Sequence, residues 1–132
     1  MDPVKYLLIT VFFVAFSYGT FLSQPDGKAL FARHCLTCHQ ADGSGVPMMF
    51  PPLIGTKKVL GSADTLIRIV IFGINYPLEV KGETYNQPMP ALPYLKDTEI
   101  VAIINYIRSS WGNKAPIISV KEVERVRSEG VK

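Results

Sequence analysis

Hydrophobic and polar positions follow two patterns along this chain, one continuous and one periodic. The stretch from 6 to 22 contains no charged residue. Beyond it, apolar positions recur at helical spacing over residues 26–34, 65–72 and 96–111. The intervals between these stretches are rich in Gly and Pro, which regular helices exclude from their interiors. The pattern therefore predicts a small all-α fold of three to five helices, preceded by an N-terminal hydrophobic helix.

The predicted helices carry residues at their ends that suit the start or stop of a helix. Asp26 is the expected N-cap of the first helix, and Ser62 or Asp64 that of the second. Gly73 ends the second helix. Asp97 is the expected N-cap of the third.

The C-terminal stretch, residues 117–132, has a weaker pattern. Val120, Val123 and Val126 recur every three residues among charges of alternating sign. This spacing is compatible with a short amphipathic helix that docks a partner. So few apolar residues favour instead a frayed, solvated extension.

The uncharged N-terminal run is predicted to direct the chain to a membrane. Its strongly apolar part, residues 7–16, has the length of a signal peptide, although no good small-residue cleavage site follows it. The whole run of 17 residues is also just long enough to span a bilayer as a helix. A cleaved signal peptide and a retained anchor therefore stay about equally open, with a slight preference for the anchor. We divide the chain into residues 1–22 as signal or anchor, 23–116 as the domain, and 117–132 as a charged extension.

Composition and charge restrict the classes of partner. A chain of 132 residues has room for one domain, and its 48% hydrophobic content suits a packed core. The 14 basic and 11 acidic residues give a net charge of +3 without any run of basic residues. Nucleic acid is therefore not expected as a partner.

The most specific chemical signal is a pentapeptide that directly follows the first predicted helix. Cys35, Cys38 and His39 have the spacing of covalent haem attachment, in which two thiols add to the porphyrin vinyl groups and the imidazole ligates iron. These two are the only cysteines of the chain. The motif predicts one covalently bound haem c.

Three other uses of this motif are less compatible with its surroundings. A thioredoxin-like redox pair would need a strand before it, whereas residues 26–34 have a helical pattern. A zinc site would need His34 beside the motif, and four ligands within six residues can hardly surround a tetrahedral ion. A structural disulfide would close a loop too short to contribute much stability.

Together these features resemble class I c-type cytochromes over about residues 26–116. The first helix, with Gly27 and Phe31, is similar to the first helix of that family, and the stretch around Tyr106 is similar to its last. The resemblance implies that these two helices cross, with Gly27 and Phe31 packed on Tyr106. The stretches 50–55 and 88–90 are more narrowly similar to single-haem domains that serve periplasmic reductases and haem-copper oxidases.

The same resemblance implies the ligands and surroundings of the iron. His39 and Met89 are expected as its axial ligands, with Pro52 beside His39, where a backbone carbonyl can accept the imidazole N–H. Thioether chemistry alone leaves Met48 and Met49 eligible as well. Nine apolar residues are expected in the haem pocket: Phe50, Leu53, Ile54, Leu66, Ile67, Val70, Tyr85, Leu95 and Ile104.

An iron with both axial positions filled can change charge by one electron without binding a substrate. The resemblance thus implies an electron carrier, or the haem subunit of a respiratory complex, and not an enzyme in its own right. The alternative is a haem enzyme or gas-binding haem protein whose sixth position is open. Redox proteins are the expected partners, together with a membrane if residues 6–22 remain. The expected location is the periplasmic side of a bacterial cytoplasmic membrane, where c-type haem is attached.

Overall fold

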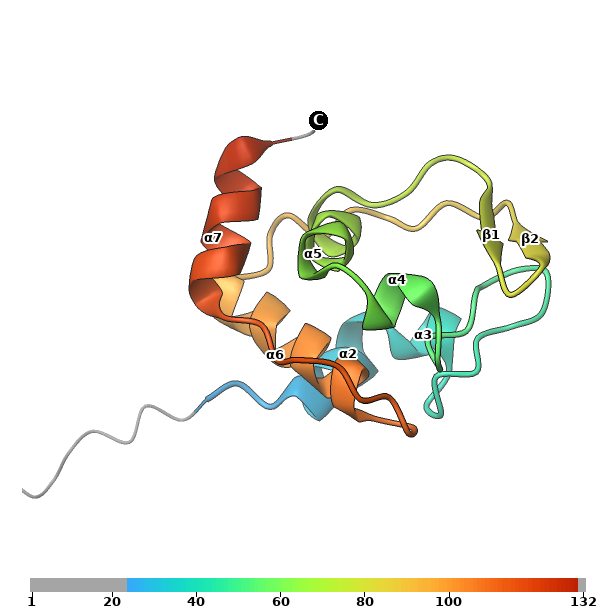
Figure 1. Ribbon diagram of the computed structural model, residues 1–132, viewed down its shortest axis with the longest axis horizontal. Helices are drawn as coiled ribbons and strands as arrows, with labels where there is room; N and C mark the ends of the chain where they lie inside the picture. The colour runs from blue at the N-terminus through green and yellow to red at the C-terminus, as the bar shows by residue number, and fades with distance from the viewer. Residues whose placement is uncertain (1–23, 131–132) are drawn as a thin grey trace, which may run out of the picture.

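In the part of the chain that the structure describes, the helices pack together and a short β-hairpin lies at one edge of them (Figure 1). The computed structural model describes residues 24–130. Figure 1 shows the order of the elements. They are α2 (Gly27–His34), α3 (Leu36–His39), α4 (Lys57–Leu60), α5 (Ala63–Phe72), β1 (Leu78–Val80), β2 (Glu83–Tyr85), α6 (Asp97–Ser109) and α7 (Val120–Glu129).

The crossing of α2 and α6 confirms the contact that the family resemblance implies. Asp26 caps α2 by accepting hydrogen bonds from the backbone of its first turn. A Cβ atom on Gly27 would lie 2.2 Å from the carbonyl oxygen of Ala102, so only glycine permits this approach. Phe31 is 2% exposed, and its ring centre lies 5.5 Å from that of Tyr106. The two terminal helices of the predicted domain are thereby locked together.

Helix α5 lies against α6 and supplies much of the core. Ser62 is its N-cap, accepting a hydrogen bond from the Thr65 amide, and Gly73 ends it at a φ of +73°. Ser62 is one of the two N-caps that the sequence offered, the helix begins two residues before the predicted stretch 65–72, and its end agrees with the prediction. Its buried face meets the isoleucines of α6 in one cluster, whose innermost members include Ile67, Ile71, Ile100, Ile103 and Ile104.

The short elements between the predicted helices, α3, α4, β1 and β2, were not expected. Helix α4 is a single turn capped by Thr56, too short to produce a periodic signal. The antiparallel pair β1 and β2 places Leu78 opposite Tyr85 within a stretch that the sequence predicted as extended or looped. Helix α6 begins one residue earlier than expected, because Lys96 and not Asp97 is its N-cap.

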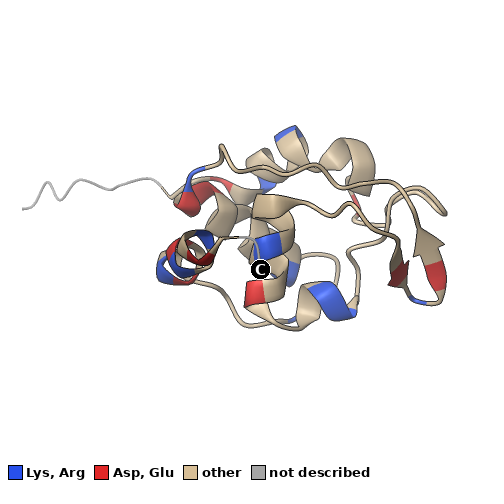
Figure 2. Cartoon of the chain, turned by 90° about the horizontal axis from the view of Figure 1, so that it is seen from above, with Lys and Arg blue, Asp and Glu red and all other residues tan. Residues whose placement is uncertain are grey.

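The prediction of a solvated C-terminal extension is wrong. Ser119 and Glu122 form a reciprocal capping box that starts α7. Val123 and Val126 are both 0% exposed, because α7 packs against α5 and α6. The charged residues between them face outward, and Figure 2 shows both signs of charge gathered on this helix. The two valines bury the apolar face of this short helix against the domain.

Within residues 24–130, no helix is long and apolar enough to cross a membrane. The hydrophobic helix predicted for residues 6–22, and with it the choice between anchor and cleaved signal, lies outside the described residues.

Candidate functional site

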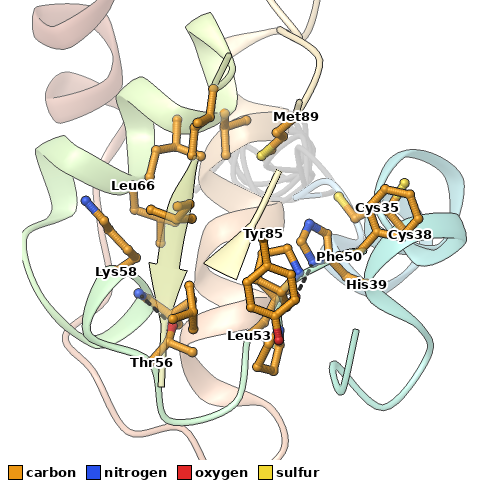
Figure 3. Close-up of a pocket in the computed structure, with 18 of the residues that line it drawn as sticks. Cys35, Cys38, His39, Phe50, Leu53, Thr56, Lys58, Leu66, Tyr85 and Met89 are labelled. Atoms are coloured by element: carbon orange, nitrogen blue, oxygen red, sulfur yellow. Dashed lines mark hydrogen bonds between the residues drawn. The ribbon is translucent and has the colours of Figure 1, made fainter. Parts of the chain in front are cut away.

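A deep apolar cavity opens between the helices and the hairpin (Figure 3). It encloses about 1010 Å³, counting the space open to solvent at its mouth. Its walls come from α3, α4, α5, α6, both strands and the loop before α6. The mostly apolar lining suits a cofactor whose surface is itself mostly apolar.

The two thiols reach the cavity from the junction of α2 and α3. Cys35 is the residue at which α2 ends, and the following turn brings Cys38 and His39 to the same wall. Both cysteines are free and half-buried. Burial, together with the nearby Cys38, raises the pKa of the Cys35 thiol to about 11. Two reduced thiols therefore stand side by side at one edge of the cavity.

His39 is oriented by a backbone carbonyl. Its Nδ1 lies 3.0 Å from the carbonyl oxygen of Pro51, which can only accept, so Nδ1 carries the proton. Burial lowers the pKa of the imidazole, while the Pro51 hydrogen bond opposes that shift. The ring is thus neutral at pH 7, with a lone pair on Nε2. Figure 3 shows one ring nitrogen turned into the cavity, toward Met89.

The carbonyl that accepts the hydrogen bond of His39 lies one residue before the expected position. The sequence pointed to Pro52 as the neighbour of His39, and Pro52 does line the cavity. The carbonyl that meets the imidazole belongs to Pro51. Consecutive carbonyls point in different directions in an extended chain, so spacing alone does not choose between them.

Asn113 holds the loop that carries Pro51, and the sequence prediction missed it. The side-chain oxygen of this buried residue accepts from the Gly55 amide at 2.8 Å. Its side-chain nitrogen donates to the carbonyls of Leu53 at 3.2 Å and Ile107 at 2.8 Å. One side chain therefore ties the loop after Pro51 to the end of α6. No periodic or compositional signal marks such a residue.

Met89 reaches the cavity from the loop that follows the hairpin. Its amide and carbonyl pair with those of Ile74, at 2.9 and 3.0 Å. A Cβ atom on Gly73 would lie 2.4 Å from the Met89 carbonyl oxygen, so glycine is needed where α5 ends. The thioether lines the cavity, and Figure 3 shows it facing His39.

The other candidate methionines lie at the surface. Met48 is 74% exposed and Met49 is 46% exposed, and neither lines the cavity. The Met48 amide donates to the Glu83 carboxylate at 3.0 Å, which ties this loop to the hairpin. Among the methionines within residues 24–130, Met89 alone reaches the cavity.

The pocket residues expected from the sequence divide into two groups. Phe50, Leu53, Leu66, Val70 and Tyr85 line the cavity as expected. The remaining four lie outside its lining: Ile54, Ile67, Leu95 and Ile104. A helical stripe identifies buried residues, but it does not separate those facing a cofactor from those facing another helix.

The donor set of this cavity fits covalent haem and fits the other candidates poorly. Two free thiols, a neutral imidazole and a thioether converge on walls that are otherwise mostly apolar. A helix and not a strand precedes the thiols, unlike in a thioredoxin-like site. No group of three or more His, Cys, Asp and Glu side chains within residues 24–130 is arranged to hold a metal ion. The zinc alternative therefore lacks its ligands in this part of the chain.

Comparison with known proteins agrees with the chemistry of the cavity. The family model for cytochrome c matches residues 25–111. A cytochrome c-552 of Thermus thermophilus is 36% identical over 120 residues, which cover 84% of this chain and 80% of that protein.

Parts of two longer proteins are also similar. The cytochrome c subunit of the quinone-dependent alcohol dehydrogenase of Gluconobacter oxydans is 34% identical over 107 residues, covering 79% of this chain and 22% of that subunit. The gluconate 2-dehydrogenase cytochrome c subunit of Pantoea cypripedii is 32% identical over 107 residues, covering 78% and 24%. The family match spans most of the described domain and includes both thiols, His39 and Met89. The chain belongs to the cytochrome c family: it is a class I c-type cytochrome that carries covalently bound haem c and transfers electrons with it.

Proposed function

We propose that this protein transfers single electrons through a haem c whose iron is held between His39 and Met89. The observation that carries the proposal is the meeting of these two side chains in one apolar cavity. They come from segments about fifty residues apart, and the thiols of Cys35 and Cys38 stand at the same wall as His39. Haem supplies a one-electron iron couple when it is bound.

The residues around the cavity set the conditions for that couple. The Pro51 carbonyl fixes the tautomer and orientation of His39 and strengthens it as a ligand. The Met89 thioether and the apolar walls would raise the reduction potential of a bound haem. If His39 and Met89 both held the iron, no position would remain for a substrate or for oxygen. The arrangement thus favours a carrier over a haem enzyme.

The surroundings of this carrier are also part of the proposal. The match to cytochrome c-552 covers most of both chains, which supports a small carrier that exchanges electrons with other redox proteins. The matches to parts of dehydrogenase subunits favour a second arrangement, in which the chain is the haem subunit of a complex. In both cases residues 1–22 would carry the domain to the periplasmic side of the cytoplasmic membrane. The intact mass of the purified protein would report both the covalent haem and the fate of those residues.

Replacing the sixth ligand tests the proposal directly. Oxidised His/Met haem has a weak red absorption band from sulfur-to-iron charge transfer. We expect Met89→Ala to abolish this band, while Met48→Ala, at an exposed position, leaves it unchanged. Survival of the band in Met89→Ala, or its loss in Met48→Ala, would contradict the assignment.

A further inference from the structure

Arg127 of α7 is bound at three points to the chain that follows Met89. Its Nε donates to Asp97 at 2.8 Å. Its two terminal nitrogens donate to the carbonyls of Pro93 at 2.9 Å and Leu95 at 2.8 Å. The planar guanidinium thus donates to three acceptors at once from nitrogens held in a fixed geometry. A lysine ammonium, with its single nitrogen, does not reproduce this arrangement.

These acceptors lie at the far end of the loop that presents Met89. The near end is fixed to α5 and to the residues that directly follow it: the Leu92 amide donates to the Val70 carbonyl of α5 at 3.0 Å, and Met89 pairs with Ile74, two residues after α5 ends. The far end, from Pro93 to the start of α6, receives its side-chain hydrogen bonds from Arg127. The loop is therefore held between α5 at one end and α7 at the other.

Helix α7 is itself firmly seated. Besides its two buried valines, Arg68 of α5 donates to the Gly130 carbonyl at 2.7 Å and forms an ion pair with Glu129. Arg125 of α7 pairs with Asp64 of α5 at 2.6 Å. Figure 1 shows α7 beside α5 and α6. Arg127 thus extends from a fixed helix, not from a mobile tail.

We propose that Arg127 is a positioning residue for the iron ligand Met89, with α7 acting as the clamp of its loop. The family model ends at residue 111, so this clamp lies outside the part of the chain that the model matches. Within residues 24–130, α7 contacts α5 and α6 but not α3, which carries His39. Loss of the clamp should therefore loosen the methionine face of the iron and leave the histidine face intact. The inference rests on the proposed ligation by Met89.

The test uses the haem-loaded protein and three variants. Arg127→Ala removes the guanidinium, and Arg127→Lys keeps a cation opposite Asp97 without the three-point contact. Arg125→Ala is the matched control, because it removes an arginine of the same helix that does not touch the loop, while the two buried valines and Arg68 still hold α7 in place. The red band of the oxidised protein and the far-ultraviolet circular dichroism are both followed during heating. Carbon monoxide binding is measured on the reduced protein at 25 °C.

In both Arg127 variants we expect the midpoint temperature for loss of the red band to lie about 5 °C or more below the midpoint for loss of helix. A shift of this size corresponds to the loss of one or two hydrogen bonds in a domain this small. A carbon monoxide adduct should form in the reduced Arg127 variants under conditions where the unaltered protein forms none, because the fraction with a free sixth position rises. In Arg125→Ala, band and helix should be lost together.

Two results would overturn the inference: simultaneous loss of band and helix in both Arg127 variants, or early loss of the band in Arg125→Ala as well. If Met89→Ala retains the red band, the proposed ligation of the iron by Met89 is itself wrong, whatever the Arg127 variants show. The Met89→Ala spectrum therefore separates the two failures.

Discussion

Asn113 supports the orientation of His39 indirectly, by holding the loop whose Pro51 carbonyl accepts the hydrogen bond of the imidazole. The imidazole donates to Pro51, and Asn113 holds the backbone on either side of Ile54 through Leu53 and Gly55. These groups are buried or half-buried, so each lost partner leaves a polar atom without water to replace it. Asn113 is thus a structural support of the proximal ligand.

Replacement of Asn113 by Ala should therefore be costly. Loss of hydrogen bonds to one amide and two carbonyls is expected to lower the free energy of unfolding by about 2–4 kcal/mol. Denaturant unfolding of the haem-loaded protein measures this change. Ser109→Ala is the control, because its exposed hydroxyl bonds only within α6 and should change stability by less than about 0.5 kcal/mol. Equal effects of the two substitutions would exclude the supporting role of Asn113.

Single residues differ in how far the sequence reveals them. Cys35, Cys38 and His39 could be predicted from the sequence, because haem attachment requires a fixed local spacing. Met89 was preferred by family resemblance, since thioether chemistry alone also allowed two other methionines. Pro51 could not be distinguished from Pro52, because the direction of a carbonyl depends on backbone angles that side-chain identity does not specify. Asn113 acts across about sixty residues of sequence, and no local pattern records such a contact.

Helix α7 shows how a few contacts can order a highly charged segment. Its capping box joins Ser119 and Glu122, whose carboxylate accepts from the Ser119 hydroxyl at 2.8 Å and from its amide at 2.7 Å. These hydrogen bonds lower the pKa of Glu122. The ionised carboxylate therefore stabilises the start of the helix, and the protonated form does so less.

This cap predicts a pH-dependent difference between the unaltered protein and Glu122→Gln. A carboxylate with a lowered pKa adds stability above the pKa of the unfolded chain and loses it as pH falls through the folded value. The difference in unfolding free energy, at most about 1 kcal/mol at pH 6, should thus shrink toward zero as the pH falls below about 4.5. Denaturant unfolding at several pH values measures it. Glu124→Gln, on the exposed side of α7, is the control. A difference that stays constant down to pH 3 would contradict the role of the cap.

Elements with clear boundaries were predicted better than elements held by distant contacts. Helix α2 and the end of α5 lie where they were predicted, because Asp26 and Gly73 mark these boundaries, while α5 begins two residues earlier than predicted, after Ser62. The single turn of α4 and the three-residue strands are too short to show a period. The capping motif at Ser119 and Glu122 was present in the sequence, but the burial of two valines depends on the groove between α5 and α6. That groove exists only in the folded domain.

The molecule as a whole is built around its cavity. Six elements contribute to the walls, and twenty-four residues line it. A domain of this size buries a small core, and here the middle of that core is hollow. The apolar side chains that line the cavity therefore lack packing partners on that side unless a cofactor fills it.

Removal of the haem should for this reason remove most of the structure. The double variant Cys35→Ser, Cys38→Ser cannot form thioether links, and after purification without haem it should show strongly reduced helical circular dichroism. Its thermal transition should be broad or absent, in contrast to the cooperative unfolding of the haem-loaded protein. Cooperative unfolding and full helicity in the haem-free variant would contradict this dependence.

Exposure of the reduced protein to carbon monoxide tests the central claim most directly. With His39 and Met89 on opposite faces, the iron has no free position, so the account predicts that the absorption spectrum of the reduced protein stays unchanged under carbon monoxide at neutral pH. Rapid conversion to a carbon monoxide adduct would show an open sixth position. That result would contradict the electron carrier and favour a gas-binding or enzymatic haem.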